Sequence, residues 1–157
     1  MHKADIDRLE FILSHPMEIR KRMKLKELEL EHNESEEIPL SALNNDLQDP
    51  RTIRSGGVSS NVESLAIKRS DNLEYQTLSK MVVGTEEFQR SLDGYERIIY
   101  DYRYRRVDLG TFEWEHIAMK LTDEYCKEGK TFGKTTTLKI RDKMLRRFGD
   151  IIGHVFI

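Results

Sequence analysis

The chain has 157 residues, with 26 Lys and Arg residues against 28 Asp and Glu residues and a formal net charge of -2 at pH 7. Charged residues make up 34% of it and hydrophobic residues 38%, a balance that disfavours a large core around a deep catalytic pocket. No stretch approaches the roughly 20 apolar residues of a membrane span, and residues 1–10 lack the apolar segment of a signal peptide. We therefore expect a soluble, mainly helical, cytoplasmic protein that is not an enzyme and does not contact a membrane.

Residues 1–31 are predicted to form an N-terminal helical region. Apolar residues recur at helical spacing between Asp5 and Ser14, and Pro16 follows where a second helix can start, because proline is tolerated in a first turn. The two pieces form either a helical hairpin or one kinked helix. Farther along, an apolar stripe amid Lys and Glu residues predicts a surface or oligomerising helix. The members of this stripe are Ile19, Met23 and Leu28.

Residues 32–60 are predicted to be a linker, because the stretch is polar, rich in turn residues and contains a Gly-Gly pair. A connecting helix is predicted over residues 61–90. Asn61 is a suitable N-cap for it. Gly84 offers a stop before a new start at Thr85.

Two helices are predicted next, in residues 95–104 and 112–121. In the first, apolar residues at i, i+3, i+4 and i+7 predict one buried face. That face consists of Tyr95, Ile98, Ile99 and Tyr102. The second helix has Thr111 as its cap and Trp114 as a core anchor, and Ala118 is small enough to let another helix cross closely.

A long amphipathic helix is predicted over residues 134–152. Ile140 stands at the centre of its apolar face, which also holds Thr137, Met144, Phe148 and Ile151, while Lys and Arg residues fall on the opposite side. Residues 130–148 include seven basic residues and one acidic residue, a local charge of +6 in a chain of net charge -2. A basic face on one helix is typical of a protein that binds a phosphate backbone, although a solvated helix surface is the plainer alternative.

Three sequence blocks then carry a resemblance to a known family. They are ERIIYDYRY, FEWEHIA and IRDKMLRRF, which begin at Glu96, Phe112 and Ile140. Together they resemble region 4 of sigma factors and, more closely, the phage late transcription activators of the RinA and ArpU type. The resemblance covers about two-fifths of the chain. It implies an all-α fold in which residues 91–157 form a sigma-region-4-like helix-turn-helix domain.

The resemblance also implies a function. The protein is expected to bind double-stranded DNA sequence-specifically and to activate phage late genes in the cytoplasm of a bacterial host. Host RNA polymerase is a further candidate partner, and a homo-oligomer is expected because helix-turn-helix proteins of this size commonly dimerise. The alternative is a DNA packaging component of the small-terminase kind, although that arrangement expects the DNA-binding element before the oligomerising one. A third alternative is a helical adaptor whose basic face binds an acidic protein.

The candidate DNA-binding residues lie on and beside the last predicted helix. Those expected at base edges are Lys134, Thr135, Thr136 and Lys139. Those expected at phosphates are Lys143, Arg146 and Arg147. Arg105 and Arg106 end an earlier helix, where they either clamp the DNA backbone or stabilise that helix's C-terminus.

The spacing between the last two predicted helices departs from the family pattern. Eleven residues separate Leu121 from Gly133, whereas the turn of a helix-turn-helix has about three or four. Either the first helix continues through Tyr125 or the turn is an expanded loop.

No motif in the sequence predicts a metal site, a cofactor or a catalytic centre. The five histidines are scattered and Cys126 is the single cysteine, which leaves no ligand spacing of the kind that zinc requires. The stretch GKTFGKT at residues 129–135 resembles a nucleotide-binding loop, but its first glycine is one position too close and no apolar strand precedes it.

Overall fold

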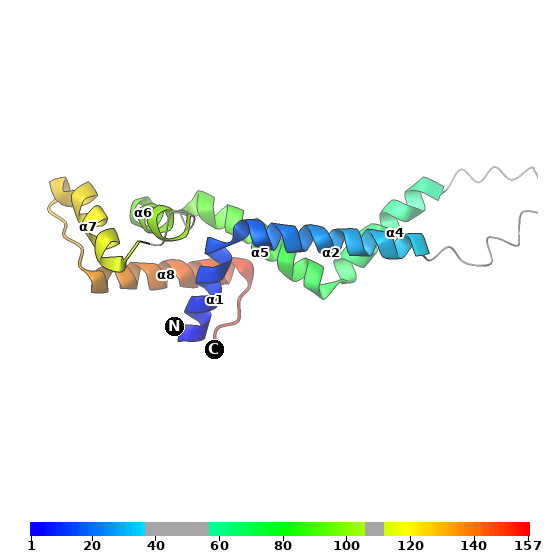
Figure 1. Cartoon of the computed structure of the whole chain (residues 1–157), viewed down its shortest axis with the longest axis horizontal. Helices are drawn as coiled ribbons and strands as arrows, with labels where there is room; N and C mark the ends of the chain where they lie inside the picture. The colour runs from blue at the N-terminus through cyan, green and yellow to red at the C-terminus, as the bar shows by residue number, and fades with distance from the viewer. Residues whose placement is uncertain (37–56, 106–111) are drawn as a thin grey trace, which may run out of the picture. The chain divides into compact units, whose positions relative to one another are not determined.

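The computed structural model describes residues 1–36, 57–105 and 112–157. Within these ranges all regular secondary structure is helical, which confirms the all-α prediction (Figure 1). The α-helices are α1 (Lys3–Ser14), α2 (Pro16–Glu36), α4 (Gly57–Asp71), α5 (Leu73–Ser91), α6 (Gly94–Tyr100), α7 (Trp114–Tyr125) and α8 (Lys134–Ile152). A π-helical segment, η1 (Asp101–Arg105), continues α6, and a 3-10 turn, η3 (Cys126–Glu128), continues α7.

The chain divides into two compact units. One comprises residues 1–19 and 80–157 and is called the terminal unit here because it contains both ends of the chain. The other comprises residues 20–79 and is called the middle unit.

The terminal unit is built around α8. In Figure 1, α1 crosses α8, and α6 and α7 lie along another side of it. The hydrophobic effect explains this arrangement, because each of these helices contributes apolar side chains that lose all contact with water. The fully buried apolar side chains are Leu9, Leu13, Phe88, Ile99, Ile117, Leu121, Met144, Leu145 and Phe148.

Helix α1 is part of the terminal unit, so residues 1–31 do not form a region of their own as the sequence suggested. Its apolar positions pack on α8 and η1. Asp5, at its start, is 1% exposed and lies 2.9 Å from Nε2 of His154, while its other oxygen accepts the N–H of Ile157 at 3.3 Å. The hydrogen bond from His154 is the main cause that lowers the pKa of Asp5 below its ordinary value. The break before α2 falls at His15, and α2 starts at Pro16 as predicted.

The predicted apolar stripe of α2 is divided between two sides of the helix. Ile19 is 6% exposed and Met23 is half-buried, whereas Leu28 is 47% exposed. The prediction that these residues share one face was wrong, because nine residues separate Ile19 from Leu28 and so place them about 180° apart on a helix.

Helices also extend into both ends of the segment predicted as a linker. Helix α2 continues to Glu36 and α4 begins at Gly57, so Asn61 lies inside a helix and does not cap one. The rest of that segment lies outside the described residues. The predicted connecting helix is interrupted at Asn72, whose side-chain oxygen accepts the N–H of Tyr75 at 2.9 Å and so caps the first turn of α5.

Gly84 does not end a helix, which corrects another prediction. Helix α5 runs through it to Ser91, and Gly84 is buried against α8. A β-carbon at Gly84 would lie 2.7 Å from Cγ2 of Ile152, closer than real contacts allow. Glycine is therefore explained by the close approach of two helices rather than by a turn.

The predicted helix over residues 95–104 is present, but its buried face differs from the predicted one. Of the four predicted residues, Ile99 is fully buried and the other three are half-exposed. The buried residues are Glu96, Ile99, Tyr100 and Tyr104. The helix starts with a capping box in which Asp93 and Glu96 bond each other's backbone N–H. The wider π turn then rotates Tyr104 toward the buried side.

Candidate nucleic-acid interface

The connection between α7 and α8 is shorter than the sequence spacing suggested. Helix α7 continues through Tyr125 and η3 extends it to Glu128, which confirms the first of the two alternatives. Five residues, 129–133, then lead into α8. Gly129 has φ = 68° and its N–H donates to the carbonyl of Cys126 at 3.0 Å, so the chain turns at a residue that adopts the left-handed conformation without strain.

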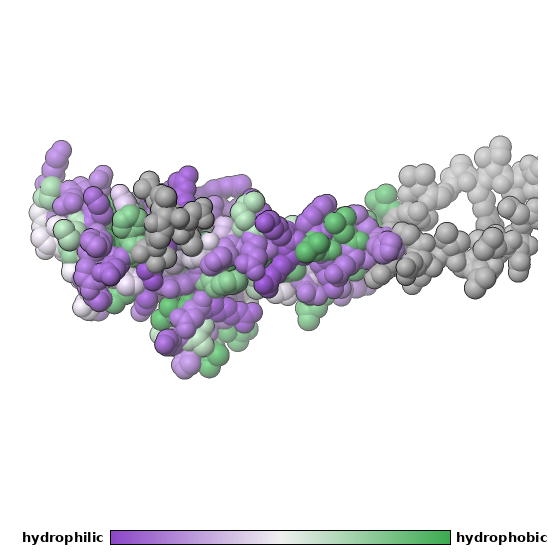
Figure 2. All heavy atoms as spheres, in the orientation of Figure 1, coloured by the Kyte–Doolittle hydropathy of each residue, from purple (hydrophilic) through white to green (hydrophobic). Residues whose placement is uncertain are grey.

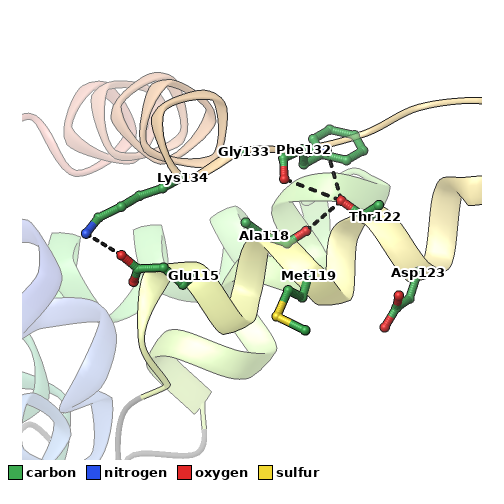
Figure 3. A pocket seen from close by; sticks show the side chains of 8 residues that line it. All are labelled: Glu115, Ala118, Met119, Thr122, Asp123, Phe132, Gly133 and Lys134. Carbon is green, nitrogen blue, oxygen red and sulfur yellow. Dashed lines mark hydrogen bonds and ion pairs between the residues drawn. The ribbon is translucent and has the colours of Figure 1, made fainter.

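Side chains tie this turn to α7 and α6. The hydroxyl of Thr122 accepts the N–H of Phe132 at 2.9 Å and lies 2.9 Å from the carbonyl of Ala118, to which it donates (Figure 3). The ring of Tyr95 on α6 lies 4.5 Å from that of Tyr125 and 5.2 Å from that of Phe132. Ala118 is 4% exposed, as expected for a close helix crossing. The start of α8 is thus held in a defined position.

An open hollow of about 320 Å³ lies between α7 and the start of α8. Figure 3 shows Lys134 and Glu115 reaching toward each other at one end of the hollow, whereas the side chains of Met119 and Asp123, which also line it, point away from this contact. The distance from Nζ of Lys134 to Oε1 of Glu115 is 2.6 Å. This contact raises the pKa of Lys134 and lowers that of Glu115. Lys134, predicted at base edges, is therefore paired with α7.

The inner face of α8 carries the core of the terminal unit. Helix bounds and amphipathic character are as predicted, but the buried face is rotated by roughly a quarter turn from Ile140, which is half-exposed. The reason is α1, which packs on α8 from a side that the sequence pattern did not reveal. The buried residues of α8 are Thr137, Met144, Leu145, Phe148, Gly149 and Ile152.

Arg141 lies on this inner face and is 14% exposed. Its guanidinium lies 5.2 Å from the ring centre of Trp114 and 3.6 Å from a carboxylate oxygen of Glu10. Trp114 is half-buried and also has the guanidinium of Arg103 over its ring, at 4.9 Å. Tyr104 donates to the same Glu10 oxygen at 3.0 Å, and burial raises its pKa. Arg141 is thus engaged inside the protein by cation–π and charge contacts.

Arg147 is also held within the terminal unit. Its Nη2 lies 2.5 Å from a carboxylate oxygen of Glu96 and 3.3 Å from the carbonyl of Ser91, at the end of α5. Its guanidinium lies 5.5 Å from the ring centre of Phe88. Glu96 is buried, so Arg147 supplies its compensating charge. The structure gives Arg147, predicted to contact phosphate, an internal partner instead.

The outer face of α8 holds the other candidates on this helix. Lys139, Lys143 and Arg146 follow one another at i, i+4 and i+7, and all are exposed. We call these three residues the basic stripe. Thr135 and Thr136 are exposed on the same side one turn earlier. From Thr135 to Arg146 the surface extends over about 16 Å of helix.

The basic stripe differs from the other cations of α8 in its charge environment. In the part of the chain that the structure describes, its three side chains have no ion pair, whereas Lys134 and Arg147 each have one and Arg141 has two. Arg105 is exposed and lies 3.3 Å from Asp101. Arg106 lies outside the described residues.

Sequence reasoning did not separate the two groups of cations on α8. The sequence did contain a signal that Arg141 faces the core. Arg141 lies one helical turn after Thr137 and one turn before Met144 and Leu145, and these three residues are buried. Arg147 had a similar signal, because it lies two turns after Ile140 on the predicted apolar face, but its partner Glu96 is 51 positions away in the sequence and could not be foreseen.

Comparison with protein families, with curated proteins and with solved structures finds no match for this chain. Among the described residues, no helix has the length and hydropathy to span a membrane. The same residues contain no group of three or more His, Cys, Asp or Glu side chains that could hold a metal ion.

Proposed function

We propose that the protein binds double-stranded DNA sequence-specifically, with α7, its turn and α8 acting as a helix-turn-helix. The single observation that carries the proposal is the uncompensated basic stripe on the outer face of α8. Cations that have no internal partner can contact phosphates without first breaking an ion pair.

The position of the stripe fits docking in a major groove. An α-helix fits this groove, and the N-terminal part of a recognition helix contacts base edges. Thr135, Thr136 and Lys139 lie in that part of α8, so we assign base contacts to them, ahead of Lys134 with its Glu115 partner. Lys143 and Arg146 lie farther along the same face, where they contact phosphates.

The core behind α8 supports this role. The inner face is fixed by Met144, Leu145 and Phe148, all 0% exposed, and the turn is fixed by Thr122. A recognition helix held this firmly has a fixed backbone, so little backbone entropy is lost on binding.

The resemblance of three sequence blocks to phage late transcription activators supports a proposal for the biological role. We propose that the protein binds a late promoter as a homo-oligomer and activates transcription there, with host RNA polymerase as a partner. The proposal involves no catalytic chemistry and no cofactor.

Selection from a duplex library with a randomised central region tests this function. Purified full-length protein is expected to enrich a common sequence motif. Enrichment should be lost in the variant Thr135→Ala/Thr136→Ala/Lys139→Ala, because these residues face the bases in the proposed complex. Retention of the same motif by this variant would contradict the assignment of base contacts.

The alternatives predict other results. A packaging component of the small-terminase kind would assemble into a ring on DNA and would not activate a promoter that carries the selected motif. A helical adaptor for an acidic protein would show no DNA binding at physiological salt. An enriched motif that supports activated transcription by the host polymerase is the result expected of a regulator.

A further inference from the structure

The middle unit buries little apolar surface. Of its described residues, Leu30 is the sole buried hydrophobic one, at 9% exposure. Ion pairs join α2 to the neighbouring helices: Arg69 lies 2.8 Å from both Glu27 and Glu31, and Lys26 lies 2.9 Å from Glu74. Partly exposed ion pairs contribute little stability, and helices need apolar contacts to be stable in a protein.

One side of α2 is nevertheless apolar at its centre and exposed. Leu25 is 61% exposed and Leu28 is 47% exposed, and Lys21 and His32 are exposed on the same side. We call these four residues the outer seam. They follow one another at intervals of four, three and four positions, the spacing that lines up residues on one face of a helix for packing against another helix. Figure 2 shows hydrophobic surface over the middle of α2 with hydrophilic side chains around it.

The charges of α2 are divided between its two halves. Residues 20–26 include five basic residues and no acidic one, whereas residues 27–36 include five Glu residues and no Lys or Arg. Basic charge near the N-terminus and acidic charge near the C-terminus oppose the helix macrodipole. Within a single copy the distribution is therefore unfavourable, but it complements a second copy of the same helix that runs in the opposite direction.

We propose that the outer seam of α2 binds the outer seam of a second copy of this chain in antiparallel orientation. A two-fold axis between Leu25 and Leu28 places Leu25 of each copy against Leu28 of the other copy, at the centre of the contact. It also places the basic half of each helix beside the acidic half of its partner. A parallel pair would instead bring Lys21 against Lys21 and the two acidic halves together.

Flanking positions support the same orientation. In an antiparallel pair of helices, Lys24 lies beside Glu31 of the second copy and Arg22 beside Glu29, and symmetry repeats each contact. Lys24, Glu29 and Glu31 also have ion pairs within the chain, so the contacts with the second copy extend an existing charge network. Each of these four positions pairs opposite charges. The proposal is independent of DNA binding, because it concerns the middle unit and its test contains no DNA.

The mass of the full-length protein in solution gives the first test. Sedimentation equilibrium over 1 to 100 µM, on the order of the affinity of a weak homodimer, is expected to show a dimer. The variant Leu25→Ser/Leu28→Ser should be monomeric with unchanged helix content. The control Val62→Ser/Ile67→Ser, which changes two apolar side chains of α4 that are 67% and 59% exposed, should still dimerise. A wild-type monomer throughout, or a Leu25→Ser/Leu28→Ser dimer as tight as the wild type, would overturn the proposal.

Disulfide trapping tests the orientation. In a Cys126→Ser background, one preparation carries Lys21→Cys and another carries His32→Cys. The antiparallel seam predicts a disulfide-linked dimer when the two preparations are mixed and little when each is oxidised alone, since these positions lie about 16 Å apart along one helix. Efficient linking of each variant to itself, without preference for the mixture, would show a parallel pair and overturn the proposal.

Discussion

The two faces of α8 show how burial assigns different tasks to residues of one type. Arg141 on the inner face and Arg147 at its edge neutralise carboxylates and cover aromatic rings of the same chain. On the outer face, Lys139, Lys143 and Arg146 are exposed and have no ion pair among the described residues. Cations on the inner face therefore contribute to folding, and cations on the outer face are free to bind.

This division means that changes to the inner face should cost stability, whereas changes to the outer face should cost binding. The predictions below concern the free energy of unfolding, from the largest expected loss to the smallest.

Phe148→Ala removes the largest side chain that α8 buries completely. We expect a loss of about 3–5 kcal/mol, because the substitution removes apolar contacts and leaves a cavity. Urea unfolding followed by circular dichroism measures it. Ile140→Ala, at a half-exposed position of the same helix, is the control and should lose clearly less. Equal losses would show that Ile140 is as buried as the sequence pattern predicted.

Glu96→Gln removes the charge that faces Arg147. We expect a loss of about 1–3 kcal/mol, since the substitution weakens a charge-assisted hydrogen bond and one half of a capping box. Arg147→Ala in the Glu96→Gln background should cost less than Arg147→Ala alone. Additive losses in this double-mutant cycle would mean that the two side chains do not interact.

Tyr104→Phe removes the hydroxyl that donates to Glu10 of α1. We expect a loss of about 1 kcal/mol, the usual net contribution of one hydrogen bond. If Tyr104→Phe proved neutral in thermal unfolding, the contact between η1 and α1 would not contribute to the fold.

Lys139→Ala/Lys143→Ala/Arg146→Ala changes the outer face of α8. We expect the free energy of unfolding to stay within about 0.5 kcal/mol per substitution, because exposed side chains without partners contribute little and alanine favours a helix. A loss as large as that of Glu96→Gln would show that the basic stripe has a structural role.

The sequence was sufficient for features that depend on local pattern. The bounds of α8 follow from its helical periodicity and from glycines at both ends, of which Gly153 has φ = 71°. The burial of Ala118 follows from a small residue within an apolar stripe. Helical periodicity also explains why five of the candidate residues on α8 lie together on its outer face. These are Thr135, Thr136, Lys139, Lys143 and Arg146.

Features that depend on distant partners could not be predicted in this way. A glycine at position 84 is compatible with a helix end and with close packing against Ile152. The sequence around it does not distinguish these two cases, and the packing of α8 does. The separation of Leu28 from Ile19, by contrast, follows from spacing alone, because nine residues turn a helix by about 180°, and one of the two is exposed and the other buried. The position of α1 in the terminal unit depends on contacts with residues at the other end of the chain, such as Asp5 with His154.

The central claim is that the basic stripe binds DNA, and a salt series tests it most directly. Fluorescence anisotropy with a labelled 30-base-pair duplex, a length of about three helical turns, compares wild type with Lys139→Ala/Lys143→Ala/Arg146→Ala. The control Lys3→Ala/Arg8→Ala/Lys80→Ala removes the same charge from exposed positions of the terminal unit outside the helix-turn-helix. The stripe variant should bind more weakly and lose about 3 from the slope of log K against log salt, while the control should keep the wild-type slope. Equal slopes for all three proteins would contradict the account.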